Sequence, residues 1–158
     1  MELRSASNQD RPAVERLVFG VLREFGLSPD AHTDADLRDI EAAYIRSGGI
    51  FDVLVSPSGE IVGTIGLCPV SSSTCELRKM YLDKSIRGQG HGRRLLEHAL
   101  TRAKKLGFTR IALETANVLK TDVALYERYG FKEYTPTHKS CRCDRAYYLD
   151  LAQYPRTL

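Results

Sequence analysis

The sequence predicts a mixed α/β (α+β) fold of about seven strands and about four helices, in the order β-α-α-β-β-β-α-β-α-β-β. Three observations support this prediction. Residues 51–55, 61–67 and 74–82 are runs rich in β-branched and apolar residues, which is the composition of strands. Residues 92–106 repeat apolar side chains at the spacing of an amphipathic helix. Glycines that stop helices separate the two kinds of segment.

The first third of the chain predicts one strand and two helices. Residues 3–7 form a short strand, and Asp10 is then placed to cap a helix that carries a proline in its first turn. Apolar residues follow at helical spacing until Gly26. A second helix is expected to begin at Asp34 or Asp36 and to stop at a pair of glycines.

The rest of the chain alternates between the two element types. Residues 56–60 are rich in turn formers, so the strands on either side are expected to form an antiparallel hairpin. The helix at 92–106 is closed by Gly107. The remaining expected elements are a strand at 111–115, a helix at about 120–129 closed by Gly130, and strands near 131–134 and 146–151.

Length and composition favour a single domain, residues 1–158, of an ordinary globular protein with 42% hydrophobic and 27% charged residues. The net charge of +3 is too small to indicate nucleic-acid binding. No apolar run reaches the roughly 18 residues that span a bilayer, and the N-terminus lacks an apolar signal segment. We therefore expect a cytoplasmic protein without nucleic-acid or membrane partners.

The four cysteines are expected to be free thiols, because nothing in the sequence indicates export. Cys141 and Cys143 could supply half of a metal site, but only His138 lies near them and no second ligand pair has a recognisable spacing. His91 and His98 are two helical turns apart, too far to bind one ion together, and are expected on the surface. The sequence therefore predicts no metal site.

A glycine-rich loop separates the strand ending at Leu82 from the helix at 92–106. Gly88, Gly90 and Gly92 alternate directly before the helix. Glycine permits positive φ and close backbone approach, so successive N–H groups can converge on one anion, and the helix N-terminus adds attraction. The expected ligand is a phosphate group.

Two common phosphate-binding patterns do not fit this loop. The dinucleotide pattern G-x-G-x-x-G would put Arg93 or Leu95 in the place of its last glycine, and the G-K-[ST] of a nucleoside-triphosphate loop is absent from the chain. The pattern that fits is R-x-x-G-x-G, formed by Arg87, Gly90 and Gly92 between a strand and an amphipathic helix. Here the sequence resembles the GNAT superfamily of acyl-CoA-dependent N-acetyltransferases.

The resemblance covers nearly the whole chain. Residues 76–82 (ELRKMYL) look like the family's fourth strand, and residues 125–131 (LYERYGF) look like its final helix and the start of the strand after it. The family fold that this implies is a mixed, mostly antiparallel central sheet flanked by helices. The implied co-substrate is acetyl-CoA, bound through its coenzyme A part and without a metal.

The resemblance also implies which residues hold the cofactor. Backbone groups of Met80, Tyr81 and Leu82 would pair with the pantetheine arm as an extra strand would, and the Leu82 N–H would face the thioester oxygen. Backbone amides of the loop would take the pyrophosphate. The cofactor-binding residues expected in the loop are Arg87, Gly88, Gln89, Gly90, His91, Gly92 and Arg93.

One position departs from the family pattern. Many members carry an asparagine that contacts the cofactor seven residues before a tyrosine that corresponds to Tyr126, whereas this chain has Leu119 there. Asn117 is displaced by two residues and is the remaining candidate for this contact.

Acyl transfer to an amine requires a base for the amine and an acid for the departing thiolate. By resemblance, Tyr126 is the candidate acid, and packing in the core is its alternative role. Glu76, four residues before Met80, and Glu114, on the next strand, both match glutamates that serve as the base in family members. We favour Glu76, while a surface salt bridge remains the alternative role of each glutamate.

The predicted function is an N-acetyltransferase that moves an acetyl group from acetyl-CoA to a primary amine by direct attack in a ternary complex. A small molecule or amino acid is the favoured acceptor, and Tyr44, Phe51, Tyr134, His138 and Arg142 are candidates to border it. A non-catalytic module that senses acyl-CoA is the alternative, because it would keep the loop without needing the acid or the base. A homodimer is left open.

Overall fold

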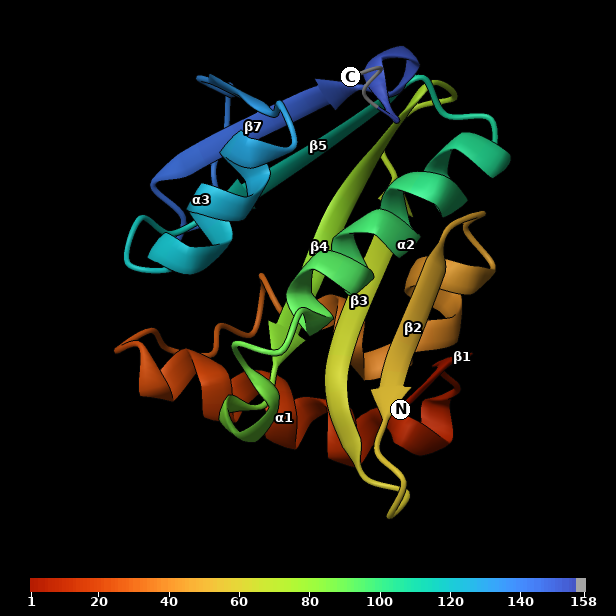
Figure 1. The fold of residues 1–158 in the computed structure, drawn as a ribbon, viewed down its shortest axis with the longest axis vertical. Coiled ribbons are helices and arrows are strands. Elements are labelled where there is room, and N and C mark those ends of the chain that lie inside the picture. Colours follow the sequence, from red (N-terminus) through yellow and green to blue (C-terminus); the bar gives the residue numbers. More distant parts are fainter. Residues whose placement is uncertain (156–158) are drawn as a thin grey trace.

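The computed structural model describes residues 1–155, and residues 156–158 of the predicted domain lie outside the described residues. Within the described residues, seven strands form one sheet in the order β1-β2-β3-β4-β5-β7-β6 (Figure 1). Neighbouring strands are antiparallel except for β4 and β5, which are parallel. The predicted mixed, mostly antiparallel sheet is therefore confirmed. The strands are β1 (Glu2–Ser5), β2 (Ile50–Val55), β3 (Ile61–Pro69), β4 (Thr74–Leu82), β5 (Arg110–Thr115), β6 (Lys132–Tyr134) and β7 (Arg145–Asp150).

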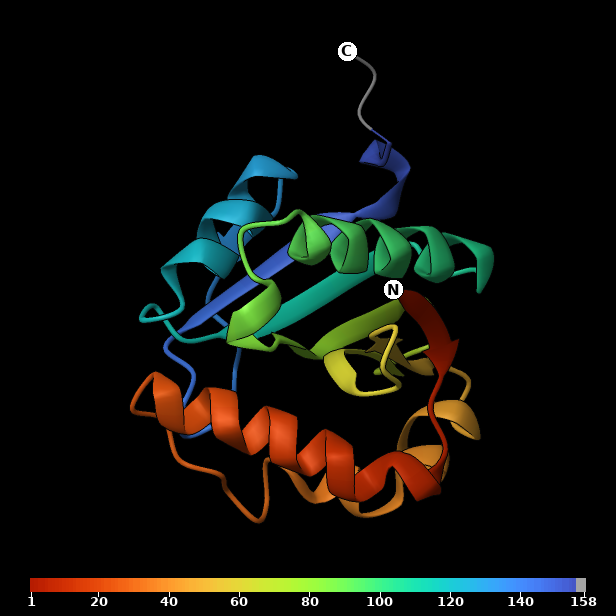
Figure 2. The ribbon, with the colours of Figure 1, turned by 60° about the horizontal axis from the view of Figure 1, so that its bottom comes forward.

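Helices cover both faces of the sheet, as Figure 2 shows. Helix α1 (Arg11–Glu24) and the turns at 35–45 cover one face, where their apolar residues share a core with β2. Helices α2 (His91–Lys105) and α3 (Lys120–Arg128) cover the other face. The apolar stripe predicted for α2 is buried against the strands, except for Leu106 just past the helix end, which is exposed. No helix within residues 1–155 has both the length and the apolarity to cross a membrane.

The second predicted helix is not α-helical. Residues Ala35–Asp39 form a 3₁₀ helix, and Glu41–Ile45 form a π-helical turn. Side chains bind N–H groups that an α-helix would use. Asp39 Oδ1 accepts a hydrogen bond from the Ala42 N–H at 3.0 Å, and Asn8 Oδ1 accepts one from the Glu41 N–H at 3.2 Å. Competition from these two side chains, the local Asp39 and the distant Asn8, therefore interrupts the regular helix.

The start of α1 also differs in detail from the prediction. Asp10 precedes the helix, but its carboxylate makes no capping bond to it. The carboxylate accepts a hydrogen bond from the Ser7 N–H at 2.9 Å and pairs with Arg4 at 2.8 Å instead. Ser7 caps the short 3₁₀ turn that leads into α1.

Candidate functional site

One edge of β4 becomes free halfway along the strand. β4 pairs with β3 along most of its length, but with β5 only over Thr74–Leu77. Beyond that point the two strands separate (Figure 1), and residues 78–82 have no partner strand on the β5 side within the described chain. An unpaired strand edge can accept an extended group as a further strand. This is the edge on which Met80, Tyr81 and Leu82 lie.

A β-bulge interrupts β4 where the strands separate. The register with β3 shifts between Thr64 and Gly66, and Lys79 has a φ of 54°, in the left-handed region. The Thr64 hydroxyl donates to the Lys79 carbonyl at 2.6 Å, which holds the bulge. Arg78 and Lys79 both line a pocket beside the strand, although they are neighbours in sequence.

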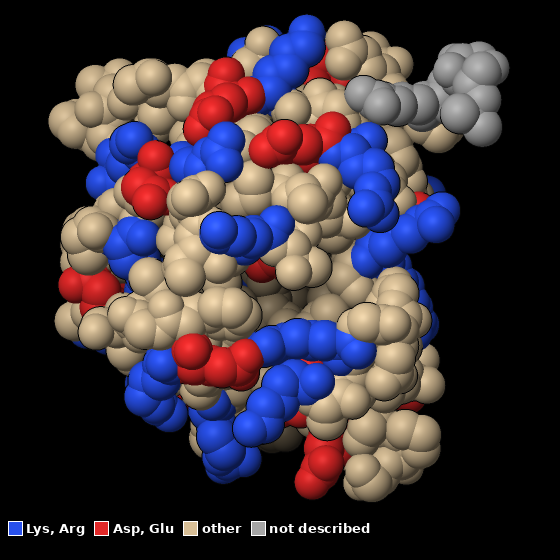
Figure 3. Space-filling model, turned by 60° about the vertical axis from the view of Figure 1, so that its left-hand side comes forward, with Lys and Arg blue, Asp and Glu red and all other residues tan. Residues whose placement is uncertain are grey.

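Two pockets open beside this part of β4, and they meet. The first, about 720 Å³, lies between β4, the end of β5, segment 30–36 and the loop before β7. The second, about 900 Å³, lies between the end of β4, the glycine loop, α1 and α3. Both volumes fall within the range of small-molecule sites. Figure 3 shows this side of the molecule hollowed, with Lys and Arg side chains around the opening. The residues that line both pockets are Met80, Tyr81, Leu119 and Asp122.

The glycine loop forms part of the wall of the second pocket. Gly88 and Gly90 have φ of 75° and 87°, a conformation that glycine adopts without strain. Gly90 is also the N-cap of α2, so the amides of the first helical turn have no partner within the helix. Gly88, Gly90, Gly92 and Arg93 line the pocket. The positive φ angles and the helix start that the sequence predicted are present, and binding of an anion by the loop remains a prediction.

The side chain of Arg87 anchors the loop. Its Nε and Nη2 donate to the Leu82 carbonyl at 3.1 and 2.9 Å, and its guanidinium also pairs with Glu24 and lies over the ring of Phe25. Arg87 still lines the second pocket. Because most of the N–H donors of Arg87 bind protein groups, its main effect is to hold the loop against the end of β4.

Three predicted cofactor-binding residues do not line either pocket. The Gln89 side chain is exposed and reaches the Ser85 carbonyl at 3.4 Å, and His91 is likewise absent from the pocket walls. Asn117 is held elsewhere, because its Oδ1 accepts a hydrogen bond from Arg145 at 3.0 Å. Leu119, the residue at the family's asparagine position, lines both pockets instead.

Tyr126 lies in the last turn of α3 and lines the first pocket. Its side chain is buried, and its hydroxyl donates to the Met80 sulfur at 3.9 Å, so it points at the junction of the two pockets. Burial, with Asp122 nearby, raises the pKa of Tyr126 well above its usual value. The phenol therefore stays protonated at neutral pH, which is the state that a general acid needs. It also packs against the ring of Phe131, so it serves the core as well.

Glu76 and Glu114 both line the first pocket. Glu76 pairs in register with Ala112, so Glu114, two residues further along β5, projects from the same face of the sheet. Glu76 accepts a hydrogen bond from Arg78 Nε at 2.9 Å, and Glu114 accepts one from the Ser140 N–H at 3.4 Å. Burial and the charge of Glu76 raise the pKa of Glu114. The structure therefore brings the two candidate bases together.

A cluster of buried charges ties the bulge to two distant loops. Lys79 Nζ lies 3.1 Å from Asp36 and 3.3 Å from Asp34, and Arg142 pairs with Asp34 at 2.7 and 2.8 Å. The hydroxyl of Tyr44 donates to Asp36. The four side chains that form the ion pairs are each at most 10% exposed. Sequence reasoning missed the cluster, although Lys79 follows Cys75 and Leu77 at an alternating position where a buried strand residue is expected.

The ionisation of Asp34 should make the free energy of unfolding depend on pH in the acid range. Burial alone would raise its pKa, but the hydrogen bond from Arg142, the Asp30 N–H and the charge of Lys79 outweigh burial and lower the pKa to about 2. Its stabilising contribution, about 2 kcal/mol, is therefore complete above pH about 4 and is lost as the pH falls through about 2. Urea unfolding between pH 5 and 2.5 is expected to show a shallower loss of stability in Asp34→Asn than in wild type. Asp150→Asn, an exposed control, should keep the wild-type slope, and equal slopes in all three proteins would refute the assignment.

Asp122 is a second residue that the sequence did not single out. It lies in the first turn of α3, lines both pockets, and burial raises its pKa to about 6. Its position four residues before Tyr126 places it on the same face of the helix. It is therefore a titratable group at the junction where the two pockets meet.

The cysteines and histidines do not form a metal site in the described part of the chain. All four cysteines are free thiols, as expected, and no group of three or more His, Cys, Asp or Glu in residues 1–155 could hold an ion. His98 differs from the prediction, because it is half-buried and its Nε2 lies 2.6 Å from the buried carboxylate of Asp52. It links α2 to β2.

Comparisons with known proteins agree with the fold. The model of the acetyltransferase (GNAT) family matches residues 19–131. YjgM, an uncharacterized N-acetyltransferase of Escherichia coli K12, is 39% identical over 136 residues, which are 82% of this chain and 81% of the relative. A GNAT-family acetyltransferase from Staphylococcus aureus Mu50 has a TM-score of 0.89 at 27% identity, with 95% of this chain and 98% of that chain covered. A phosphinothricin acetyltransferase from Sinorhizobium meliloti, solved with acetyl-CoA, has a TM-score of 0.75 at 18% identity and shares the fold over 99% of this chain and 91% of its own.

Proposed function

The chain belongs to the acetyltransferase (GNAT) family and is an acetyl-CoA-dependent acyltransferase, and we propose that it acetylates the primary amine of a small molecule or amino acid. The observation that carries this proposal is the meeting of the two pockets at Met80, toward which the Tyr126 hydroxyl points, beside a free strand edge. The second pocket, here called the cofactor pocket, holds acetyl-CoA. The first, here called the acceptor pocket, holds the amine.

The cofactor pocket suits coenzyme A in two respects. The amides of Gly88, Gly90 and the first turn of α2 bind the pyrophosphate. The free edge of Met80 to Leu82 binds the pantetheine arm, and the Leu82 N–H faces the thioester oxygen. Acetyl-CoA supplies the activated acyl group. The solved relatives that carry acetyl-CoA support the cofactor through their shared fold.

Tyr126 and the two glutamates of the acceptor pocket divide the proton transfers between them. As the amine nitrogen bonds to the carbonyl carbon and the carbon–sulfur bond breaks, Tyr126 donates its proton to the departing thiolate sulfur. Glu76 accepts the proton that the amine loses, through a water molecule, and Glu114 is the second candidate for this role. The raised pKa of Glu114 brings it closer to neutral pH, which suits a base.

A thiol-release assay tests the proposed function. Purified protein is incubated with acetyl-CoA and a panel of primary amines, and coenzyme A release is followed with a thiol reagent while the acetylated product is identified by mass spectrometry. We expect amine-dependent release for at least one class of amine. Tight acetyl-CoA binding without release for any amine would instead identify a non-catalytic sensor.

Replacing Gly90 by alanine should weaken acetyl-CoA binding. Gly90 has a φ of 87°, in the left-handed region, where an alanine costs about 1–2 kcal/mol. No heavy atom lies within 4 Å of the added Cβ, so the cost comes from the backbone conformation alone. The loop should then leave its anion-binding geometry, and calorimetry should show a Kd about 5- to 30-fold higher than that of wild type. Gly20→Ala is the matched control, because Gly20 lies inside α1 with room for a Cβ and no positive φ. An unchanged Kd in Gly90→Ala would remove the loop from the cofactor site.

A further inference from the structure

The acceptor pocket contains buried cations, but two of them are already neutralised. Lys79 lies between Asp34 and Asp36, with its side chain 5% exposed. Arg142 makes two hydrogen bonds to Asp34 and is 10% exposed. Neither cation offers free charge to a molecule that enters the pocket.

Arg78 differs from these two residues. It lines the same pocket, and its side chain is 33% exposed. Its Nε donates to Glu76 at 2.9 Å, and within residues 1–155 neither Nη atom has a protein partner. A guanidinium presents its two Nη donors as a planar fork that matches a carboxylate. Arg78 therefore has an unused anion-binding group at the pocket surface.

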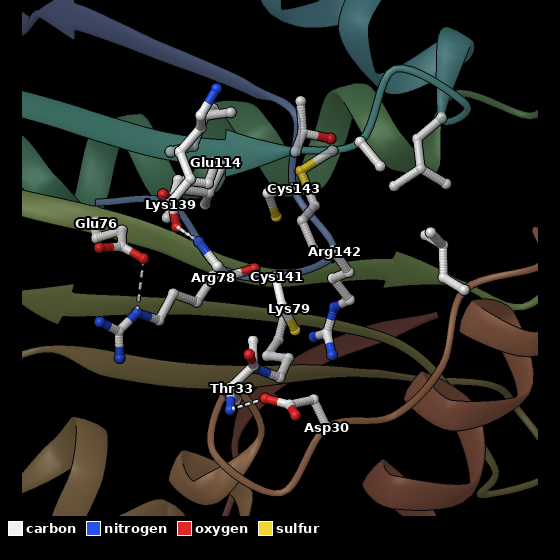
Figure 4. Close-up of a pocket in the computed structure, with 18 of the residues that line it drawn as sticks. Asp30, Thr33, Glu76, Arg78, Lys79, Glu114, Lys139, Cys141, Arg142 and Cys143 are labelled. Carbon is white, nitrogen blue, oxygen red and sulfur yellow. Dashed lines mark hydrogen bonds and ion pairs between the residues drawn. The ribbon is translucent and has the colours of Figure 1, made fainter. Parts of the chain in front are cut away.

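Two carboxylates lie beside this fork. Figure 4 shows the carboxyl groups of Glu76 and Glu114 and the guanidinium of Arg78 gathered at one end of the pocket. Glu114 receives only the long 3.4 Å hydrogen bond of Ser140 within the described chain. This end of the pocket thus combines one available cationic fork with a carboxylate that makes no ion pair with a described residue, although the charges of Arg78 and Lys139 act on it.

We propose that the acceptor is an amino acid with a free carboxylate, which the Nη fork of Arg78 binds while Glu76 and Glu114 receive its ammonium group. This inference rests on the proposed acetyltransferase function. The opposite charges of a zwitterion match the opposite charges of the site. A diamine would place its second cation against Arg78, and the amines of a protein, whether a lysine side chain or an N-terminus, carry no adjacent carboxylate.

Matched acceptors test the proposal. Each set contains an L-amino acid, its amide and its decarboxylated amine, for example L-methionine, L-methioninamide and 3-(methylthio)propylamine, and the sets cover acidic, basic, apolar and aromatic side chains. Thiol release gives kcat/KM for each compound. We expect wild type to prefer the free acid over its amide by about ten-fold or more, because a bidentate charged contact is lost in the amide.

Three variants test whether Arg78 causes the preference for the free acid over its amide. Arg78→Gln should abolish it, and Arg78→Lys, which keeps the charge but loses the fork, should retain part of it. Arg110→Gln is the control, because Arg110 is an exposed arginine of the neighbouring strand that pairs with Asp150 and lines neither pocket. Calorimetry with acetyl-CoA should give a wild-type Kd for every variant, which shows that the cofactor site is intact.

The outcomes separate this inference from the function on which it rests. Equal or faster turnover of the amides and amines, or an unchanged preference in Arg78→Gln, overturns the role of Arg78 and leaves the acetyltransferase function in place. Acetyl-CoA binding without thiol release for any compound overturns the proposed function and this inference together.

Discussion

Replacement of Tyr126 by phenylalanine is expected to lower kcat about 100-fold or more while the Kd for acetyl-CoA changes little. The hydroxyl is the proton donor that we assign to the departing thiolate, and general acid catalysis typically contributes a factor of this size. The ring remains, so its packing against Phe131 and its burial are kept. Single-turnover kinetics with saturating amine should show the loss in the chemical step, and calorimetry should show the retained affinity.

Tyr129→Phe is the matched control for this variant. Tyr129 follows α3 directly, but its hydroxyl is engaged with Glu97 and Arg93 on the outside of the helices, and it lines neither pocket. Its replacement should leave kcat close to wild type. If Tyr126→Phe turns over as fast as Tyr129→Phe, the hydroxyl of Tyr126 has no role as an acid and the residue belongs to the core alone.

Replacement of Lys79 by methionine is expected to reduce the free energy of unfolding by about 3–5 kcal/mol, because removing one partner of a buried ion pair leaves uncompensated charge. Methionine keeps the length of the side chain, so packing changes little. Asp34 would keep Arg142, but Asp36 would keep only the hydroxyl of Tyr44. Total stabilities of small proteins are about 5–15 kcal/mol, so the loss should be plain in urea unfolding at pH 7.

Two further variants identify the cause of this loss. Arg46→Met removes a cation that pairs with Asp39 on the surface, where both side chains are at least half exposed, and should cost less than about 1 kcal/mol. The double variant Lys79→Met with Asp36→Asn should recover part of the stability, because the abandoned carboxylate is neutralised. A Lys79→Met protein as stable as Arg46→Met, or a double variant without recovery, would show that an uncompensated buried charge is not the cause of the loss.

Local patterns predicted much of this protein. The bounds of β4, 74–82, and the buried stripe of α2 follow from alternation and helical spacing, which depend only on near neighbours. The glycine loop was predicted for the same reason, because positive φ and a helix start are properties of a few consecutive residues. The α-helix predicted at 35–45 was wrong, because the side chains of Asp39 and the distant Asn8 bind N–H groups that the helix would use.

The chain's local chemistry therefore determined the order of strands and helices and the glycine loop, and the resemblance of its motifs to the GNAT family indicated the cofactor. Tertiary structure decided the acceptor side. Asp34 and Arg142 are 108 residues apart, and Asp36 and Lys79 are 43 apart, so their pairing becomes visible only when β4, segment 30–36 and the loop before β7 are packed together. The unused fork of Arg78 depends on the same packing, because a charge is available to a ligand only when its neighbours leave it unpaired. No spacing rule within one segment contains that information.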